Sequence, residues 1–361
     1  MAQIKNTTIN DTGSVTLPVG TSTQRPSSAS NGMMRFNSET KLTEWFDSNY
    51  NSWFPTGFIP PVAAGGAITN ITQTGVNYRV HTFTTVGTST FTVTRSGEVE
   101  YLIIGGGGAG GGNLSGGGGA GGVLTGFATV YPGNYEIIVG AGGAKFTSSS
   151  VNSQAGGTSN PGKQSSALGL TALGGGAGGG GSSGILATGG ASGGGQGGYV
   201  ARASQNGTAG QGHRGGKGST SSQNYRAGGG GGAGGPGGDW TNSAGRGGFG
   251  GPGICSQIEG SLIWYAGGGG GGAYSVSSGG HGGIGGGGGG GANGPEGGKG
   301  GLGRSNGGDG YGNSLGSVAS SLPVGGDGGA NTGSGGGGVG HQTALSGAGG
   351  SGIVVIRYRT S

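Results

Sequence analysis

The sequence predicts an all-β protein in which a β-framework carries a bundle of polyglycine II helices, with no α-helix. Glycine fills 110 of the 361 positions, and only nine of these glycines precede Tyr101. Segments rich in Val, Ile, Thr, Tyr and Phe flank the glycine-rich part on both sides, as is typical of strands. With only 11 prolines and with irregular GGGG runs, the chain does not fit a collagen triple helix.

Residues 1–60 are expected to form a small β module. Short strands are predicted at 33–37, 42–47 and 52–54, separated by turn residues. Three short strands bury little apolar area, and the single cysteine, Cys255, excludes an internal disulfide. A module of this kind is therefore expected to need partner chains, and a linker is expected at 61–77.

A β-sandwich framework is expected from residues 78–173 together with 351–361. Strands are predicted at 78–85, 89–97 and 98–104, and another in "QSSALGLTALGG". The segment 123–140 is predicted to be a hairpin, because Pro132 and Gly133 suit a type II turn. The final segment, "SGIVVIRYRT", reads as a strand that must pair with a distant part of the chain. Residues 174–350 are therefore expected to be an insertion held at both ends.

That insertion is predicted to be a polyglycine II bundle with display loops. A single left-handed threefold helix has no internal hydrogen bonds, but helices without Cβ atoms can lie side by side and bond one another. Ordering each glycine costs about 1–2 kcal/mol, whereas each hydrogen bond returns about 0.5–1.5 kcal/mol net. Glycine runs are thus expected to be rigid inside a large bundle anchored on a folded sheet, and disordered elsewhere.

Composition and motifs point away from several function classes. A net charge of +5 with 8% charged residues predicts no basic patch for nucleic acid. No apolar segment suits a signal peptide or a membrane span, so assembly in a reducing cytoplasm without membrane insertion is expected. A phosphate-binding loop of the GxxxxGK[ST] type does not occur, and the four histidines lie in separate segments. The chain is therefore expected to be no enzyme and to have no catalytic, cofactor-binding or metal site.

Aromatic residues between the glycine runs are the candidate contact residues. One interpretation is that they cap the ends of the bundle or line a subunit contact. The other is that they form a recognition surface, because Tyr and Trp give large contact area at low entropic cost. If consecutive rods are antiparallel, alternate loops share an end. One end would then carry Tyr199, Trp240 and Tyr274, and the other Tyr225, Trp264 and Tyr265.

The segment "LPVGTSTQRPSSASNGMMRFNSETKLTEWFDSNYNSW" resembles a short β module near the start of tail-fibre and other virion proteins of tailed bacteriophages, especially cyanophages. The resemblance covers about residues 10–55. It implies that residues 1–60 attach the chain to other virion proteins of the tail, baseplate or neck.

The segments "VHTFTTVGTSTFTV", "VEYLIIGGGGAGGG", "GGAGGVLTGFATVYPGNYEIIVGAGG" and "SGIVVIRY" are similar to the glycine-rich domain of phage fibre proteins. They are also similar to the glycine-rich region of anaplastic-lymphoma-kinase-type receptor ectodomains, whose cysteines are missing here. The resemblance covers about residues 78–361 and implies a jelly-roll-like sandwich with inserted polyglycine II helices. It further implies a homotrimer, and host-surface binding by the loops.

The expected function is that of a virion fibre subunit whose loops contact a host surface glycan or outer-membrane protein. Other hypotheses are a structural decoration or a neck or head fibre without a receptor, a disordered RNA-binding protein, and an ice-binding protein. Arg246-Gly247-Gly248-Phe249 resembles an RGG box, but a single copy is better explained as part of a rod.

Overall fold

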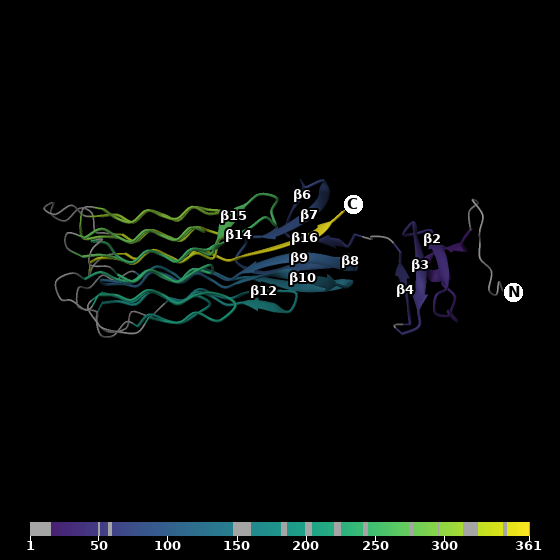
Figure 1. The fold of residues 1–361 in the computed structure, drawn as a ribbon, viewed down its shortest axis with the longest axis horizontal. Coiled ribbons are helices and arrows are strands. Elements are labelled where there is room, and N and C mark those ends of the chain that lie inside the picture. The colour runs from purple at the N-terminus through teal and green to yellow at the C-terminus, as the bar shows by residue number, and fades with distance from the viewer. Residues whose placement is uncertain are drawn as a thin grey trace. The chain divides into compact units, whose positions relative to one another are not determined.

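The computed structural model of the protein describes residues 16–49, 51–56, 60–146, 160–181, 186–198, 204–219, 225–240, 245–274, 277–294, 296–312, 324–341 and 345–360. These residues contain strands and one 3-10 helix, and no α-helix, which confirms the all-β prediction (Figure 1). The chain divides into two compact units, Met1–Pro60 and Pro61–Ser361.

The first unit is a four-stranded sheet in the order β1-β2-β3-β4. Its elements are β1 (Val19–Gly20), the 3-10 helix η1 (Ser22–Gln24), β2 (Met34–Asn37), β3 (Leu42–Asp47) and β4 (Ser52–Pro55). The three predicted strands are therefore confirmed as β2, β3 and β4. The interior is partly polar, because the buried Glu44 carboxylate accepts hydrogen bonds from Arg25 at 2.7 Å and Asn37 at 3.1 Å.

The second unit begins with a sandwich of two five-stranded antiparallel sheets. One sheet has the order β10-β9-β16-β7-β6 and the other has the order β13-β12-β11-β8-β5. The strands of the first sheet are β6 (Ala67–Gln73), β7 (Val76–Phe83), β9 (Gly97–Ile104), β10 (Val123–Val130) and β16 (Ile353–Arg359). Those of the second are β5 (Val62–Ala64), β8 (Gly87–Arg95), β11 (Gly133–Val139), β12 (Ser165–Ala167) and β13 (Leu170–Ala172).

The C-terminal strand β16 lies at the centre of its sheet, between β7 and β9. One face of this sheet packs on the second sheet, with Phe91, Ile103 and Ile356 in the shared core. The other face packs on a ribbon formed by β14 (Ile254–Ser256) and β15 (Ile263–Tyr265). The prediction that the last strand pairs with a distant segment is thus confirmed, and β16 is buried on both faces.

Two expectations about the framework are wrong. Residues 61–77 are not a linker, because they form β5, β6 and the start of β7. Residues 123–140 are not a hairpin, because β10 pairs with β9 while β11 pairs with β8 in the other sheet. Turn residues mark the chain reversal at Pro132 and Gly133, but they carry no information on whether the chain changes sheets. The Tyr135 hydroxyl fixes this corner by accepting a hydrogen bond from Tyr131 N–H at 2.8 Å.

Beyond the sandwich, the glycine-rich runs extend side by side (Figure 1), and their hydrogen bonds have a period of three residues. In the run at 115–122, every third N–H donates to the same neighbouring run, and the three runs that accept are at 173–179, 228–231 and 333–339. Its carbonyls accept from three other runs, at 105–111, 192–195 and 269–272. None of its residues has a positive φ, so the run is a left-handed threefold helix with six hydrogen-bonded neighbours. This is the polyglycine II arrangement that the composition predicts.

Close contact explains why these runs exclude larger residues. A Cβ added to Gly118 would lie 2.1 Å from the carbonyl oxygen of Gly108, far inside any real contact distance. At Gly269 the corresponding distance, to the Gly336 carbonyl oxygen, is 2.0 Å. The backbones can therefore bond on all sides only where side chains are missing.

The residues that belong to the polyglycine II bundle and those that belong to the β-sandwich differ from the prediction. The runs at 105–122, 140–143 and 160–163 belong to the bundle through hydrogen bonds such as Gly106 N–H to Lys163 O at 2.8 Å. Conversely, β14 and β15 lie inside 174–350 but pack on the sandwich. The reason is continuity, because β9, β11 and β13 run directly into glycine helices and the run at 115–122 runs directly into β10.

Candidate functional site

The end of the bundle remote from the sandwich, called the distal end below, is located by hydrogen bonds. Ser115 begins the run that leads into β10, so it lies at this remote end. The Ser115 carbonyl accepts from Gly272 at 2.9 Å, and its N–H donates to Val339 at 2.7 Å. Tyr274 and His341, each two residues further along, therefore lie at the distal end.

Three aromatic side chains form a cluster there. The rings of Tyr225 and Tyr274 contact edge to face with centroids 5.6 Å apart. Tyr274 also stacks on His341, with centroids 6.2 Å apart. Backbone pairing holds the two tyrosines together, because Tyr274 N–H donates to Tyr225 O at 3.0 Å. Burial lowers the pKa of His341, so the ring in the stack is neutral at pH 7.

Trp240 lies in the same region. Its N–H donates to Lys217 O at 3.0 Å, and its indole is half-buried. The preceding residue, Asp239, accepts from Lys217 N–H at 2.9 Å and from Arg214 Nη1 at 3.0 Å. Partial burial alone would raise the pKa of Asp239, but these hydrogen bonds hold it below its ordinary value. Trp240 thus lies at the end of a segment that is hydrogen-bonded to Lys217 and Arg214.

The structure places the other candidates differently from the prediction. Tyr225 and Tyr274 share an end, although they were expected at opposite ends. Trp264 and Tyr265 lie on β15 against the sandwich, and Tyr265 is fully buried, which removes it from the contact candidates. Its hydroxyl donates to Glu259 Oε2, and burial, the largest cause, together with this bond raises its pKa. Tyr199 lies outside the described residues.

The wrong assignment of ends has a simple cause. The prediction takes each glycine-rich segment as one rod, but the segment "GTAGQGHRGGKG" contains a turn at Thr208 to Gln211, where Gln211 N–H donates to Thr208 O at 3.0 Å. Other glycine segments turn in the same way, for example at Ile284 to Gly286. His341 was missed, although it is a ring-bearing residue three positions after the end of a glycine run, much as Tyr274 is two positions after one, and this signal could have found it.

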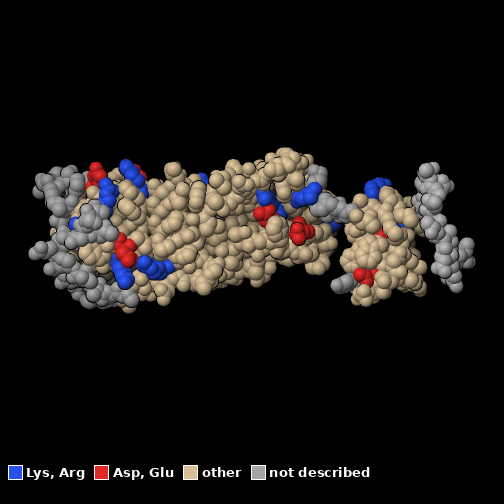
Figure 2. All heavy atoms as spheres, viewed as in Figure 1, with Lys and Arg blue, Asp and Glu red and all other residues tan. Residues whose placement is uncertain are grey.

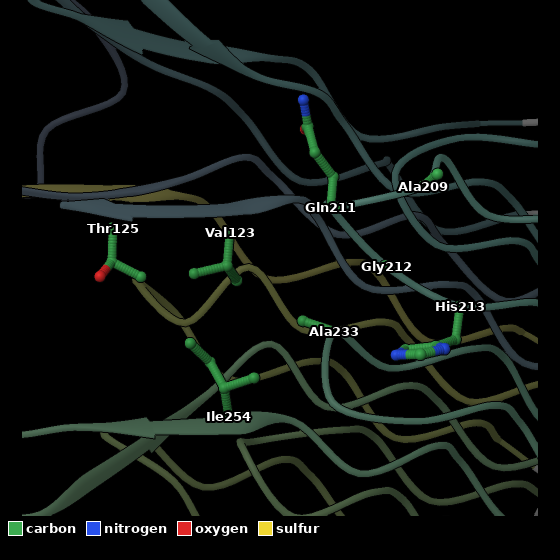
Figure 3. A pocket seen from close by; sticks show the side chains of 9 residues that line it. Val123, Thr125, Ala209, Gln211, Gly212, His213, Ala233 and Ile254 are labelled. Atoms are coloured by element: carbon green, nitrogen blue, oxygen red, sulfur yellow. The ribbon is translucent and has the colours of Figure 1, made fainter.

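A shallow groove of about 540 Å³ lies where the bundle meets the sandwich (Figure 3). Val123, Ala233 and Ile254 turn toward one another, and Gln211 points away from them (Figure 3). Gln211 is structural, since its Oε1 accepts from Leu173 N–H at 2.8 Å. The groove has an exposed His213 at its rim but no nucleophile or carboxylate among its lining residues.

The described residues also bear on metal sites, membrane spans and free thiols. They contain no group of three or more His, Cys, Asp or Glu side chains placed to hold a metal ion. No helix in this part of the chain has the length and apolar character needed to cross a membrane. Cys255 is an exposed free thiol.

Comparisons with known proteins bear on the glycine-rich part of the chain. Neither the curated proteins nor the solved structures gave a match. Residues 84–317, which span the sandwich strands β8 to β13 and most of the bundle, match a family described as "Glycine-rich domain". The match covers more than half of the sequence, and the chain therefore belongs to this glycine-rich domain family.

Proposed function

We propose that the chain is a structural subunit of a phage virion fibre, and that its distal end contacts the host cell surface. Residues 1–60 would attach it to other virion proteins, a homotrimer would complete the small N-terminal module, and the host contact would be a surface glycan or an outer-membrane protein. Assembly would take place in the host cytoplasm, and no enzymatic activity is part of the proposal.

The observation that carries this proposal is the aromatic cluster of Tyr225, Tyr274 and His341 on a rigid support. Among the described residues, these rings belong to neither apolar cluster of the sandwich, and they lie at the end of helices whose backbones are hydrogen-bonded on all sides. A support held in this way loses little entropy when its end binds a partner. Tyrosine and tryptophan at such a position suit a recognition surface.

Charge distribution supports the same interpretation. On the face shown in Figure 2, charged side chains of the Pro61–Ser361 unit gather near its two ends, and few lie along the middle of the bundle. The middle therefore has few groups for specific recognition, whereas the distal end combines aromatic rings with the ion pair of Arg214 and Asp239, 3.0 Å apart.

Substitution at the distal end tests the proposal. Trp240→Ala and Tyr274→Ala are each expected to lower host adsorption about tenfold, a loss of about 1.4 kcal/mol of binding free energy. The melting temperature of the Pro61–Ser361 unit should stay close to that of the parent protein. Trp264→Ala is the matched control, because it removes an indole at the opposite end and should leave adsorption unchanged.

A second candidate function is a decoration, neck or head fibre without a receptor. It predicts that virions carrying both distal substitutions adsorb normally. That result would overturn the host-contact proposal and leave the structural role.

A further inference from the structure

A second group of side chains lies on the side of the bundle, on runs that follow one another across its surface. Gly250 N–H donates to His281 O, Gly282 N–H donates to Lys299 O, and Gly310 N–H donates to Gly298 O, each at 2.8 Å. The runs containing Phe249, His281, Lys299 and Asp309 are therefore neighbours in this order. The lateral patch is defined here as Arg246, Phe249, His281, Glu296, Lys299 and Asp309.

The patch has a flat aromatic surface. The rings of Phe249 and His281 are stacked with centroids 5.3 Å apart and planes within 10° of each other. Phe249 is 48% exposed, which leaves part of its ring open to solvent. The exposed part of the Phe249 ring is therefore available for contact with a ligand.

Hydrogen bonding at His281 brings two donor groups together. Lys299 N–H donates to His281 Nδ1 at 2.8 Å, so Nδ1 carries no proton. Burial, aided by the charges of Arg246 and Lys299, lowers the pKa of His281, and the neutral ring then carries its proton on Nε2. Arg246 Nη1, which can only donate, lies 3.2 Å from this Nε2. Two N–H groups therefore face each other with no acceptor between them, and an acceptor oxygen that lies beside both would relieve this contact.

Charges in the patch balance. Arg246 Nη2 pairs with Glu296 Oε2 at 3.3 Å, and Lys299 Nζ pairs with Asp309 Oδ2 at 2.9 Å. Two cations and two carboxylates leave the patch formally neutral, and the side chain of Glu296 is 67% exposed. An acidic polymer would meet these carboxylates, whereas a neutral ligand with hydroxyl groups can use both donors and acceptors.

We propose that the lateral patch binds a neutral hexose unit of a glycan. The apolar face of the sugar ring stacks on Phe249, and one hydroxyl oxygen accepts from His281 Nε2–H and Arg246 Nη1–H. A neighbouring hydroxyl donates to the Glu296 carboxylate. This site lies on the side of the bundle close to its distal end, since Gly238 N–H, two residues before Trp240, donates to Phe249 O at 2.8 Å. Its binding chemistry does not depend on the host-contact role of the distal end.

Binding to the purified full-length chain tests this inference. The probes are methyl α-D-glucopyranoside, methyl α-D-galactopyranoside and methyl α-D-mannopyranoside, followed by saturation-transfer NMR, with dextran, galactan and mannan in affinity electrophoresis. At least one sugar and its polymer should bind, with a dissociation constant of about 1 mM for the monosaccharide. Polygalacturonate, an acidic polymer, should bind more weakly than the neutral polymers.

Matched variants assign the binding to the patch. Phe249→Ala and Arg246→Gln should each weaken it at least about tenfold, whereas Phe249→Tyr should preserve it. Leu302→Ala, which truncates another exposed side chain on the same surface, should have no effect. The proposal is overturned if no neutral probe binds, if Phe249→Ala binds as well as the parent, or if only polygalacturonate binds. Host adsorption of virions is a separate measurement, so failure here leaves the distal-end proposal standing.

Discussion

The residue type at a single position in this protein is restricted either by close packing or by hydrogen bonds. His81 is the clearest case of restriction by hydrogen bonds. It lies fully buried between the rings of Phe91 and Tyr358. Its Nδ1–H donates to the Gly65 carbonyl at 2.8 Å, and the Tyr358 hydroxyl, 3.4 Å from Nε2, accepts from Ala63 N–H at 3.2 Å. In its neutral form, His81 thus has a hydrogen-bond partner for each of its two ring nitrogens.

The expected consequence is a pH-dependent stability. Burial lowers the pKa of His81 below its ordinary value of 6.5, and the positive charge of Arg79 adds to this effect. As the pH falls below about 6.5 the unfolded chain binds a proton that the folded chain does not, so stability decreases, by up to about 1.4 kcal/mol per pH unit. Denaturant unfolding between pH 7.5 and 5.5 should show this slope, and His81→Gln should reduce it. An unchanged slope in the variant would exclude His81 as its source.

Close packing restricts position 118 to glycine. Gly118→Ala would place a methyl group 2.1 Å from the Gly108 carbonyl oxygen, so we expect a loss of about 3 kcal/mol or more in unfolding free energy. Gly189→Ala is the control, since its nearest non-bonded atom would be 3.5 Å away, and it should change stability by less than about 0.5 kcal/mol. Equal effects of the two substitutions would show that close packing is not what excludes side chains.

At the scale of elements, the framework strands act as anchors for the glycine helices. β9 continues into the run at 105–111, and the run at 115–122 continues into β10, so two antiparallel strands fix the spacing of two runs that bond each other. Other runs then add to this pair on several sides. A glycine helix is ordered only as part of this assembly, because an isolated one has no internal hydrogen bonds.

Hydrogen exchange tests this view of the runs. Amides of the run at 115–122 should exchange about as slowly as those of β9 and β16, because each is bonded and enclosed by six neighbouring runs. The outer run at 306–312 should exchange faster. Exchange of 115–122 at the rate of an unstructured peptide, measured by mass spectrometry, would contradict a rigid bundle.

The same elements show how far the sequence alone could lead. The β-sandwich framework could be predicted from its strand residues and from the terminal segment "SGIVVIRYRT", because β-branched residues fit a pleated sheet buried on both faces. The turns within the glycine segments could not be predicted, because a run of glycines has no side-chain pattern that marks where it reverses. This is why Tyr225 and Tyr274 were assigned to opposite ends although they are in contact. The lateral patch was missed for a related reason, since its six members are spread over four different runs.

At the scale of the whole molecule, the division at Pro60 and Pro61 separates two independent cores. Among the described residues of the first unit, the buried apolar side chain is Phe46, supported by the polar cluster around Glu44, whereas the second unit has two apolar clusters on the faces of one central sheet. A sheet as small as that of the first unit gains stability from partner chains, which agrees with the proposed attachment and trimer.

Removal of residues 1–60 separates these roles. The remaining chain should unfold at the same temperature as the second unit of the parent protein, because both apolar clusters and all the glycine runs are retained. It should also be missing from purified virions, since the proposed attachment module is gone. Calorimetry of the truncated chain and immunoblotting of virions measure the two effects independently. A truncated chain that melts at a much lower temperature would show that the units depend on each other, and one that still enters virions would place the attachment surface in the second unit.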